Sequence, residues 1–511
     1  MSTSSLNARR RERELDRLTS GERVDVIVVG GGVTGAGIAL DAAARGLSVA
    51  LIEARDLAFG TSRWSSKLVH GGLRYLAKGE FRLAHESAVE RGILMTRTAP
   101  HLTRALPQLF PLYPATSRAQ EAVIATGLRA GDALRRAART PSSVLPAPRR
   151  IPPALAAALA PGLAATGLRG ALLAYDGALV DDARLVVNLA RTAALLGARI
   201  LPRLEAVSLS GTSVRVRDGS AEYELHARQV VNATGVWAGT LTDAVRLRPS
   251  RGSHLVLAPG SAAVGSTSVN VPVPGESNRF VFFLPQLDGR VYLGLTDEPI
   301  SGEIPPVPDV PESDVDFLLS VASSVLARPL TRADVIGSYA GLRPLVAGNG
   351  SRSADLSRKH AVVTGSDGVL TIVGGKLTTY RRMAEDTVDA VLAHAGLHAG
   401  PARTARLPLL GAAPRSRLSL VDATPRLIAK YGTEAPRVAA LGQVDPEFAR
   451  PLFDGTEITA AEVVWAVRHE GALTVEDVLE RRTRLSLVPA EAEAARSRVA
   501  ELVEKALTGL S

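Results

Sequence analysis

The chain has 511 residues and no cysteine. This absence excludes disulfides, thiolate catalysis, cysteine-ligated metals and iron–sulfur clusters. The nine histidines show no HExxH-like pair, so we expect no metal site. Long apolar runs are also missing, because the most apolar stretch, residues 24–44, is interrupted by Asp41 and several glycines. No apolar segment follows the arginines near residue 10, and we expect a cytoplasmic protein.

Aromatic residues are scarce, at 4% of the chain, although the net charge is +9. A basic nucleic-acid-binding protein is therefore a distant alternative. The few rings available for base stacking and the lack of a basic reading motif argue against nucleic acid as a partner. Much of the excess charge lies in residues 101–150, which hold eight arginines against two acidic residues.

A basic amphipathic helix is predicted over residues 116–139. Helical periodicity places Arg118, Arg129 and Arg136 on one side and Val123 and Leu134 roughly opposite. Such a helix suits an anionic membrane surface. The alternative is an ordinary solvated helix face over a core contact.

The strongest motif occupies residues 24–53, VDVIVVGGGVTGAGIALDAAARGLSVALIE. A buried strand leads to Gly30, Gly32 and Gly35, which form GxGxxG at a helix start, and a second strand ends at Glu53. Gly30 would permit the tight turn, Gly32 the approach of a pyrophosphate, and Gly35 the close packing of helix on strand. Glu53 is placed to accept the ribose hydroxyls of an adenosine. This unit therefore predicts a dinucleotide site.

FAD and NAD both fit that motif, and the rest of the chain favours FAD. One later strand runs into Ala233, Thr234 and Gly235, and another into Gly374 and Gly375. Three such turns spread along the chain suit a long cofactor laid across one sheet, whereas NAD proteins usually keep their site within one half of a doubly wound domain.

Residues 65–76 read SSKLVHGGLRYL, which matches neither a helix face nor an alternating strand. The pair Gly71 and Gly72 should interrupt either element. So many polar and basic side chains in one short stretch indicate a chemical task. His254 lies in an apolar run, GSHLVL, where a histidine is either a packed core residue or a base.

The chain resembles the FAD-dependent glycerol-3-phosphate dehydrogenases, within the D-amino-acid oxidase-like flavoproteins. The motifs are GGGVTGAGIALDAAARGLSVALIE, SSKLVHGGLRYL, DDARLVVNLA, VNATGVWAG, GSHLVL, YAGLRPL and GGKLTTYR, which span residues 25–382. Departures are Arg63 and Trp64, where smaller residues are expected, and an alanine- and arginine-rich segment over residues 100–170. The resemblance implies an α/β fold. Its parts would be a Rossmann-like FAD-binding domain of the glutathione-reductase/D-amino-acid oxidase type, an antiparallel-sheet substrate domain and a helical C-terminal domain.

We expect a basic N-terminal tail over residues 1–20 and the helical C-terminal domain over residues 396–511. Between them, the FAD-binding pieces would be about 21–80, 175–245 and 340–395, and the substrate pieces about 81–174 and 246–339. Apolar runs around a turn at Leu287, Asp288 and Gly289 agree with an antiparallel sheet. A helix start is expected near Thr474 and Glu476.

The resemblance also implies which residues contact FAD. Residues after the second strand would satisfy cofactor oxygens and ring atoms, and the turn GGKLTTYR would stabilise the negative charge of the reduced ring. The expected cofactor residues are Gly30, Gly32, Gly35, Glu53, Thr61, Ser62, Ser65, Ser66, Lys67, His70, Gly71, Gly72, Ala233, Thr234, Gly235, Gly374, Gly375, Lys376, Leu377 and Thr378.

The family's substrate is sn-glycerol 3-phosphate. By resemblance, it is oxidised to dihydroxyacetone phosphate by hydride transfer to flavin N5, and the electrons pass to a quinone in the membrane. Burying a phosphate dianion requires fixed cations, and guanidinium groups match its oxygens. The implied substrate residues are Arg74, Tyr75, His254, Arg343, Arg358 and Lys376. The catalytic residues would be His254, Lys376 and Arg343, with His254 or alternatively Lys376 as the base.

Related flavoenzymes are the nearer alternatives: a glycerol-3-phosphate oxidase that uses oxygen, or an amine or amino-acid oxidase on the same fold. The set of cations argues against an amine substrate, whereas the sequence does not separate oxygen from quinone. We place the protein peripherally on the inner face of the cell membrane. A homodimer is one option for its assembly.

Overall fold

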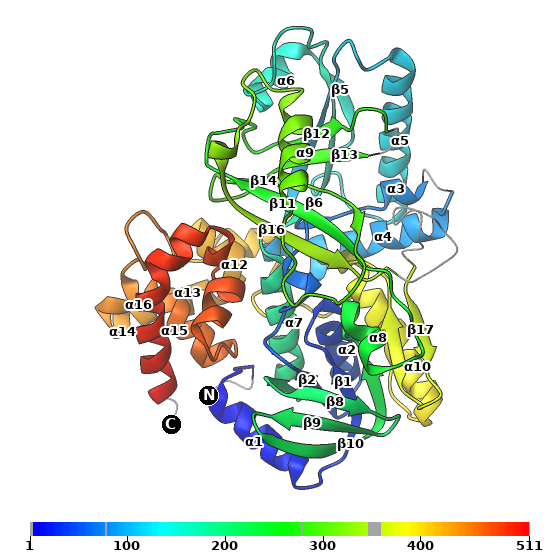
Figure 1. Ribbon diagram of the computed structural model, residues 1–511, viewed down its shortest axis with the longest axis vertical. Coiled ribbons are helices and arrows are strands. Elements are labelled where there is room, and N and C mark those ends of the chain that lie inside the picture. Colours follow the sequence, from blue (N-terminus) through cyan, green and yellow to red (C-terminus); the bar gives the residue numbers. More distant parts are fainter. Residues whose placement is uncertain (1–3, 77–78, 277–278, 346–358, 510–511) are drawn as a thin grey trace.

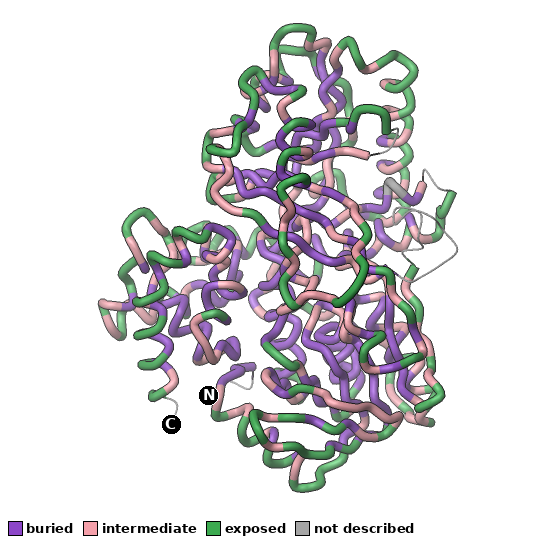
Figure 2. The backbone as a smooth tube through the Cα atoms, in the orientation of Figure 1, coloured by how far each residue is buried: buried purple, intermediate pink, exposed green. Residues whose placement is uncertain are grey.

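The computed structural model describes residues 4–76, 79–276, 279–345 and 359–509, with the backbone alone at residues 73 and 74. Two sheets form two lobes, and a helical C-terminal region lies beside them (Figure 1). Buried residues follow the strands and the inner helix faces of all three parts (Figure 2).

The first sheet has the strand order β17-β18-β10-β1-β2-β7. These strands are β17 (Ala361–Thr364), β18 (Leu370–Val373), β10 (Ala221–Asn232), β1 (Val24–Val29), β2 (Val49–Glu53) and β7 (Arg199–Pro202). All run parallel except β17, which pairs antiparallel with β18. The strands β8 (Glu205–Leu209) and β9 (Ser213–Asp218) extend the sheet along β10. The almost unbroken Val and Ile residues of β1 fit a parallel strand that is covered on both faces.

Helices pack on both faces of this sheet. The helices α2 (Val33–Ala44), α7 (Asp182–Leu195) and α10 (Tyr380–Ala395) share one core with Val26 and Val28. The alternate residues Ile27 and Val29 face a second core, which the β8 and β9 strands and the helix α1 (Ala8–Thr19) complete. This arrangement is the expected Rossmann-like domain.

The N-terminal segment is a docked helix and not the expected basic tail. Leu15 and Leu18 of α1 are buried against the sheet, and Arg11 Nε donates to the Pro202 carbonyl oxygen at 2.6 Å. The charged residues obscured the apolar stripe, because two leucines one turn apart are enough to bury one face of a short helix.

The second sheet is mainly antiparallel, with the order β15-β11-β14-β13-β12-β4-β6-β3; β16 also pairs with β11, and β5 with β6. Its strands are β3 (Leu68–Val69), β4 (Thr103–Pro111), β5 (Arg149–Ile151), β6 (Ala171–Leu179), β11 (Ser250–Leu257), β12 (Ser268–Pro272), β13 (Phe280–Pro285), β14 (Val291–Gly294), β15 (Glu298–Pro299) and β16 (Val335–Arg343). The expected turn at Leu287, Asp288 and Gly289 joins β13 to β14, which form an antiparallel hairpin. The strands β3 and β6 belong to this sheet, so the expected piece boundaries near residues 80 and 175 do not coincide with the sheets.

In the described part of the chain, the helices near the second sheet are α3 (Leu73–Leu76), α4 (Phe81–Ile93), α5 (Arg118–Ala137), α6 (Pro153–Leu159) and α9 (Glu312–Ser323). The basic helix predicted over residues 116–139 is α5, but its inner face differs from the prediction. Leu128, Asp132 and Arg135 are buried, whereas Val123 is 71% exposed. The packed stripe runs through Ile124 and Leu128, and Val123 lies one helical step outside it.

The C-terminal region is helical, as expected. It contains α11 (Arg415–Leu418), α12 (Pro425–Tyr431), α13 (Ala435–Ala439), α14 (Leu441–Val444), α15 (Ala460–His469) and α16 (Pro489–Thr508), together with the π-helical segment η10 (Asp477–Arg482). Thr474 precedes η10, and its Oγ1 accepts from the Asp477 N–H. The described N-terminal residues meet this region, since the Leu6 N–H donates to the His469 carbonyl oxygen. Among the described residues, no helix combines the length and apolar character that a membrane crossing requires.

Candidate active site

Three turns meet at one edge of the first sheet. The strands β1, β10 and β18 are parallel neighbours, so the turns after them lie side by side at their carboxyl ends. These turns contain Gly30, Ala233 to Gly235, and Gly374 with Gly375. They line one cavity of about 2730 Å³, which continues beneath the second sheet. Sequence segments that are hundreds of residues apart thus build one elongated site.

The first turn leaves room for a ligand because of its glycines. Gly30 has φ +113°, and a Cβ at this position would lie 2.6 Å from the Ala233 carbonyl oxygen. A Cβ on Gly35 would collide with the Gly30 carbonyl oxygen. The Val33 N–H at the start of α2 donates to Ser62 Oγ at 2.9 Å. This cradle fits a pyrophosphate at a helix N-terminus.

Glu53 ends β2 and lines the same cavity. Its Oε2 accepts from the Gly31 N–H at 2.7 Å, and its Oε1 accepts from the Arg55 N–H at 2.8 Å. Burial raises the pKa of Glu53, although these two N–H groups oppose the shift. The backbone therefore fixes the carboxylate at the place where a dinucleotide's ribose would lie.

The stretch SSKLVHGGLRYL crosses the floor of the cavity. Thr61, Ser62, Ser65, Ser66, His70, Gly71 and Gly72 all line it. Ser66 Oγ lies 2.8 Å from His254 Nε2, whereas Ser65 Oγ donates to Asp182 Oδ2 at 2.7 Å. His70 Nδ1 is 3.5 Å from the Asp176 carboxylate. Burial would raise the pKa of Asp176, but Arg91 and His70 lower it to about 2.

Lys67 does not point toward the cavity as a cofactor residue would. Its ammonium donates to the carbonyl oxygens of Arg63 and Ser65 and lies 3.2 Å from Asp182. Burial lowers the pKa of Lys67 to about 8, although Asp182 opposes the shift. The residue has φ +55°, which turns its side chain behind the two serines. Asp182, from the motif DDARLVVNLA, was missed as its partner; the only signal was an acidic pair before an apolar helix.

The turn GGKLTTYR supplies the third wall. Gly374 and Gly375 have φ near +75°, and Lys376, Leu377 and Thr378 follow them along the cavity. A short 3₁₀ helix, η7 (Leu377–Thr379), begins here and leads into α10. The helix start thus lies at the cavity, and the stabilisation of a negative ring edge by its amides stays a prediction.

Tyr75 is buried, at 4% exposure. Lys376 Nζ lies 3.9 Å from the centre of its ring, which makes Tyr75 a platform for this cation. Tyr75 was expected to contact the substrate directly, but it is not among the residues that line the cavity, and its ring faces Lys376 instead. Of the other expected cations, Arg358 and the side chain of Arg74 lie outside the described residues.

Arg343 and His254 come from the neighbouring strands β16 and β11, and both line the cavity. Arg343 Nη1 lies 3.2 Å from Asp297 Oδ1, and its Nη2 donates to the Thr296 carbonyl oxygen at 3.1 Å. Asp297 and Thr296 follow β14, and no sequence motif had marked them. They hold the guanidinium plane at the cavity wall.

His254 is buried at 2% exposure, with its ring stacked on Tyr339 at 4.7 Å. Burial lowers the pKa of His254 to about 3, and the positive charges of Lys67 and Arg343 contribute. The imidazole is therefore neutral at physiological pH. Packing and the contact with Ser66 fix its plane. His254 is therefore a packed core residue that also lines the cavity, and its role as a base stays a prediction.

The two unexpected residues before SSKL point in different directions. Trp64 lines the cavity and stacks on Tyr339 with ring centres 5.8 Å apart. Arg63 is fully buried on the other side of the loop, where its Nη1 pairs with Glu480 at 2.5 Å. The larger side chains thus join the second sheet and the C-terminal region to this loop.

This fold and this cavity are those of an FAD-dependent oxidoreductase, and comparison with known proteins agrees. The family model described as "FAD dependent oxidoreductase" matches residues 25–381. A second model, described as "C-terminal domain of alpha-glycerophosphate oxidase", matches residues 402–508.

Similar proteins of known name identify the family more specifically. Glycerol-3-phosphate dehydrogenase 1 of Mycobacterium tuberculosis is 52% identical over 503 residues, which cover 96% of this chain and 97% of that protein. The structure of the glycerol-3-phosphate dehydrogenase from Bacillus halodurans complexed with FAD has a TM-score of 0.73 at 27% identity and covers 98% of this chain and 94% of that one. A reduced L-α-glycerophosphate oxidase from Mycoplasma pneumoniae with FAD bound shares the fold, with a TM-score of 0.58 at 17% identity over 76% of this chain and 99% of that one.

The chain therefore belongs to the family of FAD-dependent glycerol-3-phosphate dehydrogenases. The predicted family, fold class and cofactor are confirmed. The cradle at Gly30 and Gly35, the placed carboxylate of Glu53 and the three adjoining turns fit FAD in this chain.

Proposed function

We propose that the protein oxidises sn-glycerol 3-phosphate to dihydroxyacetone phosphate and passes the electrons to a quinone in the membrane. One observation carries the proposal: Arg343, His254 and Lys376 line the same cavity as the three cofactor turns. FAD, when bound, would supply the hydride acceptor at its N5 atom. The names of the relatives support the same substrate.

Arg343 and Lys376 would bind the phosphate. A guanidinium group matches two phosphate oxygens, and Asp297 and Thr296 hold this one in place before a ligand arrives. Lys376, placed by the Tyr75 ring, would add a second positive charge. A dianion needs such fixed cations to leave water.

His254 would take the hydroxyl proton from the substrate. Its low pKa leaves it unprotonated and ready to accept, but makes it a weak base in the absence of ligand. A bound phosphate would oppose the charge of Arg343 and so raise the pKa of His254 toward the useful range. Lys376 remains the alternative base, because it lines the same cavity.

The electron acceptor separates two versions of this function. The alternative is an oxidase that uses oxygen. It should be tested because the family model that matches residues 402–508 is named after an oxidase, alpha-glycerophosphate oxidase. Turnover in air should be followed with and without a short-chain quinone while hydrogen peroxide is measured. Fast quinone reduction with little peroxide supports the dehydrogenase, whereas one peroxide per substrate without quinone supports the oxidase.

A peripheral membrane contact would bring a quinone to the protein. Arg118, Arg129 and Arg136 are exposed on α5. Two apolar side chains, Val123 and Phe81 at the start of the adjoining α4, are 71% and 68% exposed. Exposed basic and apolar residues on the same pair of helices suit an anionic lipid surface. Cosedimentation with anionic vesicles should weaken when the three arginines become glutamine, and equal binding would contradict the docking role of α5.

A further inference from the structure

The loop that lines the cofactor side of the cavity is held from behind by the C-terminal region. Gly60 to Ser62 and Trp64 to Ser66 line the cavity. The side chain of Arg63, in the middle of this loop, points the opposite way and is fully buried. Its guanidinium lies 4.2 Å from the Trp64 ring and 5.0 Å from the Phe59 ring.

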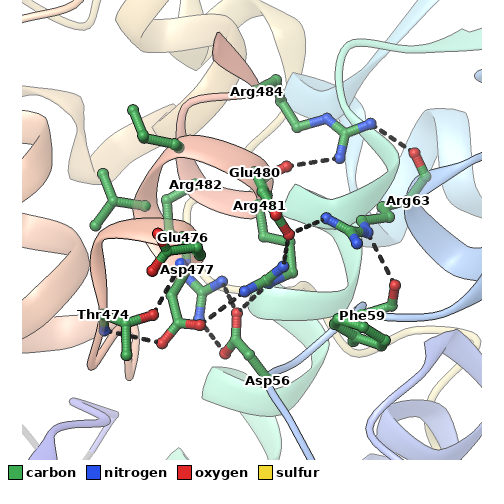
Figure 3. Close-up of polar contacts among 12 residues, drawn as sticks. Asp56, Phe59, Arg63, Thr474, Glu476, Asp477, Glu480, Arg481, Arg482 and Arg484 are labelled. Atoms are coloured by element: carbon green, nitrogen blue, oxygen red, sulfur yellow. Dashed lines mark hydrogen bonds and ion pairs between the residues drawn. The ribbon is translucent and has the colours of Figure 1, made fainter. Parts of the chain in front are cut away.

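Two residues of the C-terminal region, Glu480 and Arg484, contact this loop (Figure 3). Glu480 Oε2 lies 2.5 Å from Arg63 Nη1. Arg484 donates from Nη2 to the Arg63 carbonyl oxygen at 2.5 Å and from Nη1 to the Glu480 carbonyl oxygen at 2.9 Å. Side chain and backbone of Arg63 are therefore both tied to the same short segment.

That segment is itself anchored to the FAD-binding domain. Asp56, three residues after Glu53, is buried and accepts from Arg481 Nε at 2.6 Å and from both terminal nitrogens of Arg482 at 2.8 Å. Burial would raise the pKa of Asp56, but the two arginines lower it. The anchoring residues lie in η10, a π-helical turn, and such turns are frequent at functional sites.

Stacked rings connect Arg63 to the side of the loop that faces the cavity. Trp64, next to Arg63, stacks on Tyr339, and Tyr339 stacks on His254. Tyr339 also donates to the Ser65 carbonyl oxygen at 3.1 Å. A displacement of Arg63 would thus move the stacked rings of Trp64, Tyr339 and His254, together with Ser66, whose hydroxyl contacts His254.

We propose that Glu480 and Arg484 are positioning residues, through which the C-terminal region sets the loop of residues 60–66 against the flavin and His254. This inference rests on the proposed function. It assigns to the C-terminal region a part in the chemistry, although none of its residues need touch the substrate. Misplacement of reacting groups by about 1 Å can slow a reaction by up to about 100-fold.

Glu480→Gln tests the proposal against a matched control. Glu476→Gln makes the same change four positions earlier, where the side chain is exposed and pairs with Arg496 inside the C-terminal region. Both variants should be purified with FAD and compared in anaerobic stopped-flow reduction by sn-glycerol 3-phosphate, well below their melting temperatures. We expect flavin reduction to slow about tenfold in Glu480→Gln and to match wild type in Glu476→Gln.

A double variant separates the loop contact from the bond that Glu480 also makes to Arg481. If Glu480 acts through Arg63, then Arg63→Met/Glu480→Gln should be no slower than Arg63→Met. Should Arg63→Met fail to fold, Arg484→Lys, which keeps the charge, provides the second variant and should also slow reduction. The affinity of each apoprotein for FAD gives a readout that does not need the substrate, and we expect weaker binding in the loop variants alone.

Equal reduction rates and equal FAD affinities in wild type, Glu480→Gln and Arg484→Lys would overturn the proposal, even if their melting temperatures fell. Wild-type protein that is not reduced by sn-glycerol 3-phosphate would instead contradict the proposed function. In that case the FAD affinities alone decide whether the C-terminal region positions the loop.

Discussion

Replacing Arg343 by alanine should raise the KM for sn-glycerol 3-phosphate while FAD remains bound. Arg343 lines the cavity at the end of β16, which belongs to the second sheet, whereas the glycine turns of the cofactor site follow strands of the first. A hydrogen bond to a charged group contributes about 1.5–3 kcal/mol. Two parallel bonds from one guanidinium would therefore contribute about 3 kcal/mol or more, which corresponds to about 100-fold in affinity.

Asp297 makes this prediction more specific. Its carboxylate is 3.2 Å from Arg343 Nη1 and its side chain is 14% exposed. In Arg343→Ala this negative charge would face the phosphate without the guanidinium, so repulsion adds to the lost contact. The double variant Arg343→Ala/Asp297→Asn should therefore recover part of the loss, about tenfold in KM. The KM of Arg343→Lys should lie between those of wild type and Arg343→Ala, because lysine keeps the charge and loses the bidentate geometry.

The assay is steady-state turnover with a saturating electron acceptor, with the visible absorbance of FAD used to count active sites. Arg332→Ala is the matched control: this arginine lies just before β16, is exposed and pairs with Glu312 and Asp316. Its KM should equal that of wild type. A KM for Arg343→Ala within about twofold of wild type would remove Arg343 from the phosphate site and refute the reasoning.

Three further predictions follow from the same geometry. Gly30→Ala should yield protein without FAD, because the added Cβ would meet Ala233. The ratio of visible to ultraviolet absorbance measures the bound FAD. Gly46 also has a positive φ but open space around it, so the control variant Gly46→Ala should keep its FAD. His254→Asn should retain FAD and slow the reduction of the flavin by substrate about 100-fold or more. If His254→Asn is instead reduced at the normal rate while Lys376→Met is reduced slowly, Lys376 is the base. The folded protein should lose stability as the pH falls from about 6.5 toward 4, because buried histidines stay neutral when folded and take up protons when unfolded. The groups are His101 and His254, with pKa values lowered by burial to about 3, and His469, lowered to about 4. Urea titrations should show that the free energy of unfolding falls by about 1.4 kcal/mol per pH unit for each of these histidines. His101→Gln should remove the contribution of one histidine. An unchanged pH dependence of the free energy of unfolding in that variant would contradict the assignment.

The cofactor half of the site could be predicted from sequence because its signals are local. Gly30, Gly35 and Glu53 belong to one βαβ unit, in which apolar runs mark the strands and the glycine spacing marks the turn. The turns at Ala233 and Gly374 follow equally clear strands. Parallel pairing then brings all three turns to one edge, which is a general property of such sheets.

Side-chain direction was less predictable, because it depends on distant partners. Lys67 turns away from the cavity toward Asp182, and Tyr75 is covered by Lys376, which is far along the chain. Arg63 pairs with Glu480 across 417 positions. No local pattern reports such pairs, so the sequence showed Arg63 and Trp64 as departures without giving their reason.

Amphipathic patterns in charged helices were also ambiguous. The arginines of α5 are exposed as expected, but Val123 is exposed with them, since the packed stripe passes through Ile124 instead. In α1, two leucines outweigh the many charges around them and dock the helix. In both helices, one or two apolar contacts decide which face is buried, and these depend on the surface opposite.

The anaerobic visible spectrum tests the central claim most directly. The purified protein should show the bands of oxidised FAD, and sn-glycerol 3-phosphate should bleach them. Glycerol at the same concentration should not bleach them, because it lacks the phosphate that we propose Arg343 and Lys376 bind. Bands that persist with sn-glycerol 3-phosphate, in protein whose FAD is still reduced by dithionite, would contradict the account.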